Sequence, residues 1–174
     1  GCTHCYAERL STRFGWTSKP WTAPNAAENV VCHPGRLEIP LHWRKPRRVF
    51  VCSMSDLFHE RVPDEFIRQV FATMAHAPWH TYQVLTKRPE RMRAWIRAWP
   101  PNRILAHWTP AVAGSLSFAK RFAHVWLGVS VEDQETADRR ILQLLQVPAA
   151  VHFASLEPLL EDRVRGLRRD AGHV

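Results

Sequence analysis

The sequence predicts an α/β protein whose strands run parallel. Four short apolar stretches, rich in β-branched and aromatic residues, lie at residues 49–53, 82–86, 125–130 and 151–155. Segments with helical periodicity separate them, and a strand–helix–strand order requires parallel strands joined by right-handed crossovers. Near-continuous apolar runs are typical of a parallel sheet that is covered on both faces. A barrel-like sheet and an open, doubly wound sheet both fit this order of elements.

The segment before the first strand predicts a short helix and a long connection. Residues 7–14 form the helix, with Glu8 in its first turn where the helix dipole favours a carboxylate, and Gly15 ends it. Residues 16–46 contain repeated prolines and little periodicity, apart from a short helix near residues 25–30. Long ordered loops of this kind often carry function.

Three longer helices are predicted between the strands. Pro63 and Pro89 suit the first position of two of them, and the third runs from about Asp133 to Leu145. Each presents one apolar stripe at helical spacing, which is typical of a face packed on a core. The stripes are Phe66, Ile67, Val70, Phe71 and Met74; then Met92, Trp95, Ile96 and Trp99; and then Ile141, Leu142 and Leu145.

Length and composition indicate an ordinary globular protein. The 174 residues fit a single domain spanning residues 1–174, and 45% of them are hydrophobic. No run of about 18 apolar residues exists, so we expect no membrane span. The chain begins without the basic and then apolar stretch of a secretory leader, so we expect a cytoplasmic protein. The role of residues 100–124 is not readable from the sequence.

The chain is strongly basic. Its net charge is +8 and its pI is about 10.0, and arginines supply most of the positive charge. A basic surface favours phosphate-bearing partners, so nucleic acid is one expected partner. Because the arginines are scattered, solvated helix faces explain the same charge.

A pair of cysteines opens the chain. Cys2 and Cys5 are two residues apart and precede a helix, so their thiolates can reach one metal ion or one iron–sulfur cluster. Cys32 and Cys52 would complete the four ligands of a zinc site. Cys52 lies within a predicted strand, however, where alternation allows it to point into the core.

Polar side chains follow all four predicted strands. In a parallel α/β fold the carboxyl ends of the strands form the ligand-binding edge. Carboxylates there would hold an ammonium group or ribose hydroxyls, and Lys87 or Arg88 would hold a carboxylate or phosphate. The same residue types also cap helices, which is the alternative reading for the serines. The predicted cofactor-binding residues are Ser53, Asp56, Thr86, Lys87, Arg88, Ser130, Glu132 and Glu157, with Ser55 and Ser155 beside them.

Several of these segments resemble one known family. They occur in the order of the phage-associated three-Cys-motif family, which is named after phage gene products thirty-seven and sixty-eight and is similar to radical SAM proteins. The segments are Gly1–Arg9, Trp43–Pro46, Ser53–His59, Val84–Met92, Trp126–Glu132 and Ser155–Leu159. The resemblance implies a partial TIM-like (β/α) barrel. It also implies that Cys2 and Cys5 are two of three cysteines that bind a [4Fe–4S] cluster.

The resemblance also implies an activity. S-adenosylmethionine would bind the unique iron, and its reductive cleavage would give a 5′-deoxyadenosyl radical that acts on an unknown substrate. The family's first cysteine lies upstream of Cys2, and the family continues past Leu159. We therefore expect this chain to be a fragment, truncated at both ends, of a radical-SAM-type enzyme.

Two other functions fit the sequence. One is a zinc-stabilised nucleic-acid-binding module that uses Cys2, Cys5, Cys32 and Cys52. The other is a catalytically silent phage accessory protein that keeps the fold without the chemistry. Four converging sulfurs would favour zinc, whereas Cys2 and Cys5 at the strand ends, with Cys32 and Cys52 elsewhere, would favour a cluster.

Overall fold

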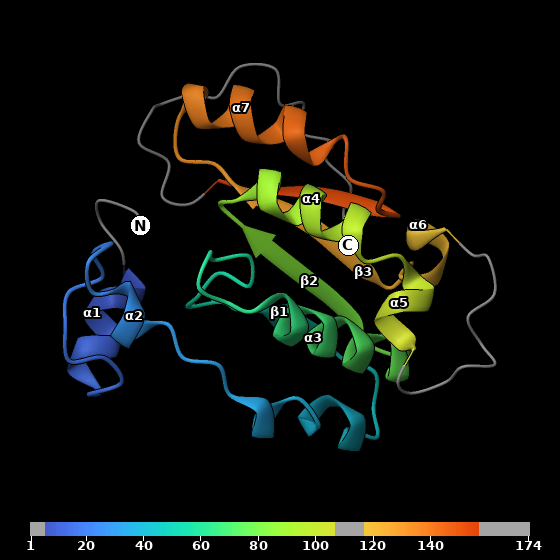
Figure 1. Cartoon of the computed structure of the whole chain (residues 1–174), viewed down its shortest axis with the longest axis horizontal. Coiled ribbons are helices and arrows are strands. Elements are labelled where there is room, and N and C mark those ends of the chain that lie inside the picture. The colour runs from blue at the N-terminus through green and yellow to red at the C-terminus, as the bar shows by residue number, and fades with distance from the viewer. Residues whose placement is uncertain (1–5, 107–116, 157–174) are drawn as a thin grey trace.

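The computed structural model describes residues 6–106 and 117–156, and these contain a four-stranded parallel sheet (Figure 1). The strands are β1 (Arg48–Val51), β2 (Thr81–Thr86), β3 (Val125–Ser130) and β4 (Val151–Ser155), and they lie in the order β1-β2-β3-β4. The predicted α/β class and the parallel pairing are therefore confirmed.

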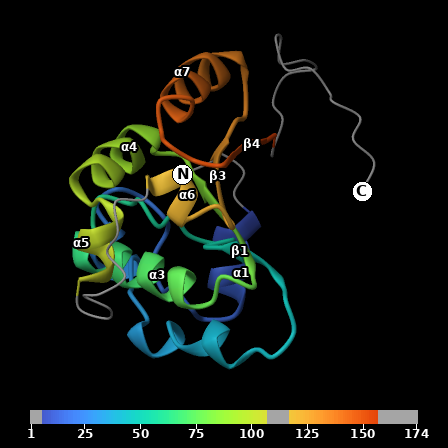
Figure 2. The same ribbon diagram turned by 90° about the vertical axis from the view of Figure 1, so that its right-hand side faces the viewer.

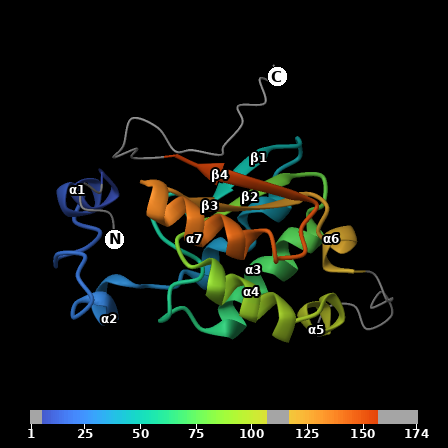
Figure 3. The same cartoon turned by 90° about the horizontal axis from the view of Figure 1, so that it is seen from above.

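Each pair of neighbouring strands is joined through a helix. These helices are α3 (Asp64–His76), α4 (Pro89–Ala98) and α7 (Gln134–Leu144), and two shorter helices, α5 (Pro101–Leu105) and α6 (Phe118–Arg121), lie between α4 and β3. All three crossover helices lie on the same face of the sheet (Figures 2 and 3). Because the strand order is sequential, every right-handed crossover moves in one direction and places its helix on the same side.

The amino-terminal elements lie beyond the carboxyl ends of the strands. Helix α1 (Tyr6–Arg13) ends before Gly15, whose φ of +66° is a left-handed conformation that glycine adopts readily. Helix α2 (Ala26–Asn29) follows, as predicted, and two 3₁₀ helices, η1 (Pro34–Arg36) and η2 (Ile39–His42), lead to β1. Figures 1 and 3 both show α1 and α2 on the side to which the strands point.

The core lies between the sheet and its three crossover helices. Val84 and Leu127 are fully buried on this side of the sheet. Phe71 of α3 stacks on Trp95 of α4, with ring centroids 5.0 Å apart. This aromatic packing fixes how two crossover helices sit on the strands, and hence where their first turns meet the strand ends.

The opposite face of the sheet differs from the sequence-based expectation of cover on both faces. No described helix packs on it, and Phe50 of β1 is 43% exposed there. Gly128 lies on this face opposite Phe153 in the β3–β4 register, and a Cβ at Gly128 would lie only 2.5 Å from the Phe153 ring. The glycine thus lets the aromatic ring lie flat on the strand. Apolar runs alone did not distinguish a helix-covered face from this aromatic-lined face, which we call the open face because no helix of residues 6–106 and 117–156 packs on it.

Helix α7 differs from its predicted stripe. Leu142 and Leu145 are exposed, while Ala137, Arg140 and Leu144 are buried. The inward position is taken by Arg140 because its guanidinium reaches a buried carboxylate at the end of β3. None of the described helices is long and apolar enough to cross a bilayer.

Candidate functional site

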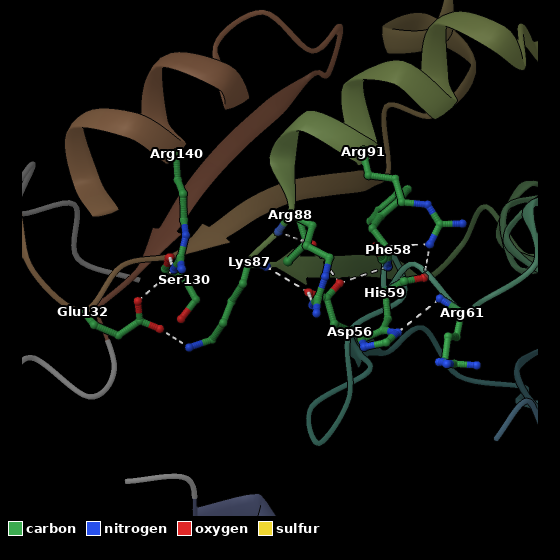
Figure 4. Close-up of polar contacts among 11 residues, drawn as sticks. Asp56, Phe58, His59, Arg61, Lys87, Arg88, Arg91, Ser130, Glu132 and Arg140 are labelled. Carbon is green, nitrogen blue, oxygen red and sulfur yellow. Dashed lines mark hydrogen bonds and ion pairs between the residues drawn. The ribbon is translucent and has the colours of Figure 1, made fainter. Parts of the chain in front are cut away.

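The candidate site is the carboxyl edge of the sheet, where polar residues from three strands come together (Figure 4). Asp56 lies in the loop after β1, Thr86 ends β2 and is followed by Lys87 and Arg88, and Glu132 lies just after β3. The parallel register places these strand ends side by side. The structure therefore brings together five of the predicted residues, which are Asp56, Thr86, Lys87, Arg88 and Glu132.

The Asp56 carboxylate joins the ends of β1 and β2. Its Oδ1 accepts from the Phe58 backbone N–H at 2.9 Å and from the Thr86 hydroxyl at 2.7 Å. Its Oδ2 accepts from the Lys87 backbone N–H at 3.1 Å and from Arg88 Nη1 at 2.9 Å. Four donors satisfy a carboxylate. Asp56 therefore fixes the geometry of this edge and orients the Arg88 guanidinium.

The Glu132 carboxylate joins the ends of β2 and β3. Its side chain is only 9% exposed, and its Oε1 pairs with Lys87 Nζ. Its Oε2 accepts from Arg140 Nη1 at 2.8 Å, and the same nitrogen donates to the Ser130 carbonyl at 2.6 Å. A carboxylate this buried needs cationic partners to stay ionised. Glu132 thus holds Lys87 in position at the edge.

The Glu132 carboxylate is buried and that of Asp56 is mostly buried, whereas two of their cations reach solvent. The side chains of Lys87 and Arg88 are 26% and 36% exposed, against 14% for Asp56. Lys87, Arg88 and Arg140 are the cations that pair with these two carboxylates among the described residues. The edge therefore presents oriented cations to an incoming carboxylate or phosphate, and the carboxylates act mainly by positioning those cations.

The predicted serines have different surroundings. The Ser53 carbonyl accepts a hydrogen bond from the Tyr6 hydroxyl at 3.2 Å, which fixes the start of α1 at the end of β1. Ser130 is buried at the end of β3 and is not the cap of α7. That cap is Asp133, which accepts from the Thr136 backbone N–H at 2.7 Å and completes a capping box. These hydrogen bonds hold the pKa of Asp133 below its ordinary value.

Sequence reasoning missed three residues at this edge. Arg140 was not recognised because it interrupts an apolar stripe, which is itself the signal that could have revealed it. His59 was not among the predicted cofactor-binding residues, yet it lies beside Asp56 and Arg88 (Figure 4). Arg91 of α4 donates to the His59 carbonyl and, at 2.6 Å, to the Val62 carbonyl, and so holds this loop.

The surroundings of His59 favour its neutral form. Burial and the nearby Arg88 lower the pKa of His59 below its ordinary value. Its Nδ1 accepts from the Arg61 backbone N–H at 3.2 Å, which assigns the ring proton to Nε2. The ring is thus left with an Nε2–H group that can donate a hydrogen bond at this edge.

The cysteines are only partly described. Cys2, Cys5 and the predicted ligand-binding Glu157 lie outside the described residues. The predicted position of Cys52 inside a strand is wrong, because β1 ends at Val51 and Cys52 has a φ of 59°. Burial raises the pKa of the Cys52 thiol, and Cys32 lies near enough to raise it further. Within residues 6–106 and 117–156, no group of three or more metal-ligating side chains is found.

The fold and the site geometry define an α/β protein with a cluster of charged residues at the carboxyl edge of a parallel sheet. A family model described as "Protein of unknown function (DUF5131)" matches residues 1–168, and the chain belongs to this family. No curated protein and no solved structure matches the chain.

Proposed function

We propose that this protein is a radical-SAM-like enzyme of the phage three-Cys-motif type, with its cofactor site at the carboxyl edge of the sheet. The single observation that carries the proposal is the hydrogen bond between the Tyr6 hydroxyl and the Ser53 carbonyl. Tyr6 directly follows Cys5 in the chain, and Ser53 follows β1. This bond therefore favours a placement of the cysteine pair beside Lys87, Arg88 and Glu132.

A partial (β/α) barrel is part of the proposal. A doubly wound sheet reverses its strand order at a switch point and carries helices on both faces. The sequential order β1-β2-β3-β4, with α3, α4 and α7 on one face, supports a barrel-like arrangement instead. The open face, with Phe50 and Phe153, would then line the interior of the partial barrel.

The donor set at the carboxyl edge fits S-adenosylmethionine. Lys87 and Arg88 would hold its carboxylate, because their cations are oriented by buried carboxylates and reach solvent. Ser53, Ser130 and Glu157 are the further groups proposed for its ammonium and ribose hydroxyls. Cys2 and Cys5 would be two thiolate ligands of a [4Fe–4S] cluster. When bound, the cluster would supply the electron for reductive cleavage of S-adenosylmethionine.

Anaerobic reconstitution tests this function. The full-length protein is loaded with iron and sulfide. Its iron content, sulfide content and electron paramagnetic resonance spectrum are then measured. We expect a [4Fe–4S] signal and reductant-dependent release of 5′-deoxyadenosine from S-adenosylmethionine. Tight zinc binding without cofactor cleavage would contradict the proposal.

Matched cysteine variants sharpen the test. Cys5→Ser is expected to abolish the cluster signal and the cleavage together. Cys32→Ser is the control, because it makes the same chemical change in the connection between α2 and η1. Equal loss of iron in both variants would show that Cys32 also binds the metal.

A zinc-stabilised module is the second candidate, and one observation favours it. Cys52 lies next to Ser53, on which Tyr6 is anchored, and Cys32 is close enough to affect the Cys52 thiol. A cluster site would place Cys52 away from the strand ends, whereas Cys52 directly follows β1. Tetrahedral binding of one zinc ion, lost equally in Cys5→Ser and Cys52→Ser proteins, would select this candidate.

A further inference from the structure

The acidic residues are unevenly distributed along the fold. Residues 39–55, 66–89 and 91–131 contain no Asp or Glu. Between these segments, the acids lie in loops after strands or in the first turns of helices, such as Asp56, Asp64 and Glu90. In a parallel sheet with helical crossovers, these positions are all at the carboxyl edge. The amino edge of the described strands is therefore poor in carboxylates.

A dense group of cations lies at the amino edge, directly before β1. We call residues 43–48 the basic loop, and its four cations, Arg44, Lys45, Arg47 and Arg48, are all exposed. None of the ion pairs recorded among the described residues involves any of them. Because β1 runs from Arg48 to Val51, the basic loop is at the opposite edge from the candidate site.

The basic loop is held rigidly by its neighbours. The Arg47 backbone N–H donates to Nδ1 of the buried His80 at 3.0 Å, and the Arg47 carbonyl accepts from the Thr81 backbone N–H at 2.9 Å. His80 Nε2 in turn lies 3.0 Å from the Pro40 carbonyl. These contacts use main-chain atoms of the loop, so its cationic side chains are left to face solvent on a fixed backbone.

Aromatic side chains lie among these cations. The Arg47 guanidinium is 4.7 Å from the Trp43 ring centroid, and the Arg48 guanidinium is 5.7 Å from the Trp126 ring on the open face of the sheet. The Trp79 indole donates to the Trp43 carbonyl at 3.3 Å and is 45% exposed. Cations stacked on indoles keep a defined orientation.

We infer that the basic loop, together with Trp79, binds a single-stranded nucleic acid. Exposed arginines and lysine bind successive phosphates, and indole and guanidinium planes stack with the bases. Every nucleobase has a flat aromatic face for such stacking, and a lipid headgroup does not. The open face continues this surface, because Arg48 on Trp126 leads to the exposed Phe50. The inference does not depend on the proposed cofactor chemistry, which belongs to the other edge.

Binding of labelled oligonucleotides tests this inference. Fluorescence anisotropy is measured with short single-stranded DNA and RNA over a range of salt concentrations, using the protein and a variant carrying Arg44→Gln, Lys45→Gln, Arg47→Gln and Arg48→Gln. The variant is expected to lose more than about tenfold in affinity, and its slope of log K against log salt should fall by about 2 to 3, since each lost contact accounts for roughly 0.7. The matched control removes four exposed arginines elsewhere, through Arg9→Gln, Arg36→Gln, Arg97→Gln and Arg139→Gln.

The stacking part has its own variant. Trp79→Ala is expected to weaken single-strand binding roughly fivefold or more. Trp16→Ala, which removes an even more exposed indole just after α1, should change it little. Three outcomes would overturn the inference: no oligonucleotide binding, equal weakening by the two four-residue variants, or loop-dependent binding to acidic lipid vesicles alone. Thermal melting confirms that each variant is folded.

Discussion

The two edges of the sheet use charge in different ways. At the carboxyl edge, Glu132 is buried and Asp56 is mostly buried, and each is paired with cations from neighbouring strand ends or from α7. At the amino edge, the four cations of the basic loop are exposed, and none of the described ion pairs includes them. Paired, buried charges stabilise and position a site, whereas exposed, like charges contribute little to folding and remain accessible to a partner.

Removal of Glu132 should have the largest effect on stability. Glu132→Ala leaves Arg140 buried without its carboxylate and releases Lys87, so we expect a loss of about 3 kcal/mol in the free energy of unfolding. Urea denaturation measures it. Glu135→Ala, at an exposed position in the first turn of α7, is the control and should cost less than about 0.5 kcal/mol. Similar values for the two variants would remove the distinction between a paired edge and an ordinary surface.

Loss of Asp56 should come second. Asp56→Ala removes an acceptor of four hydrogen bonds and leaves two backbone N–H groups without it, for an expected cost of about 2 kcal/mol. The control is Asp64→Ala, because the Asp64 side chain is 57% exposed and pairs only at the surface. A cost for Asp56→Ala no greater than that of the control would contradict its proposed positioning role.

One strand offers a direct comparison of the two edges. Thr86 at the carboxyl end of β2 donates to Asp56 at 2.7 Å, while Thr81 begins the same strand at the amino end. Thr86→Val should cost about 1 kcal/mol through the lost hydrogen bond. Thr81→Val should be closer to neutral, because β-branched residues suit strands. Chemical denaturation measures both losses in the free energy of unfolding. A larger loss for Thr81→Val than for Thr86→Val would contradict this difference between the two edges.

Acid should weaken the fold through histidines at both edges. Burial lowers the pKa of His59 and of His124 below the ordinary value of 6.5, so both prefer the neutral form in the folded state. Their contribution is fully present above pH 6.5 and is lost as the pH falls below it. Melting temperatures measured on either side of pH 6.5 should fall toward acid. The melting temperature should depend less steeply on pH in a protein that carries both His59→Gln and His124→Gln. An unchanged pH dependence would assign the acid sensitivity to other groups.

The smallest effect on stability is expected at the amino edge. The variant lacking all four basic-loop cations should unfold within about 0.5 kcal/mol of the parent protein, because exposed charges without partners contribute little. Urea denaturation of the same protein used for nucleic-acid binding gives this value. A loss of more than about 2 kcal/mol would mean that these cations have structural partners and are not a free binding surface.

Much of the fold followed from local patterns in the sequence. The strands, the crossover helices and the position of Gly15 were predicted because periodicity, proline and glycine are local signals. The meeting of Asp56, Lys87 and Glu132 followed from topology alone, since parallel strands end at one edge.

Other features depend on long-range contacts and were missed. Arg140 occupies a buried position only because Glu132 lies opposite it, so its inward direction is not encoded in the stripe of α7. Which face of the sheet stays open depends on all crossovers taking the same side. Cys52 was misplaced because a left-handed residue ended β1 earlier than the apolar run did.

The central claim is that the amino-terminal cysteine pair shares the carboxyl edge with the charged residues. A nitroxide label is attached at one of two exposed sites, through Glu60→Cys or Lys45→Cys, in a protein that also carries Cys32→Ser and Cys52→Ser. Pulsed electron paramagnetic resonance then measures the distance from the label to the reduced cluster. We predict a shorter distance from residue 60, at the carboxyl edge, than from residue 45, at the amino edge. A shorter distance from residue 45, or the absence of any cluster signal, would contradict the account.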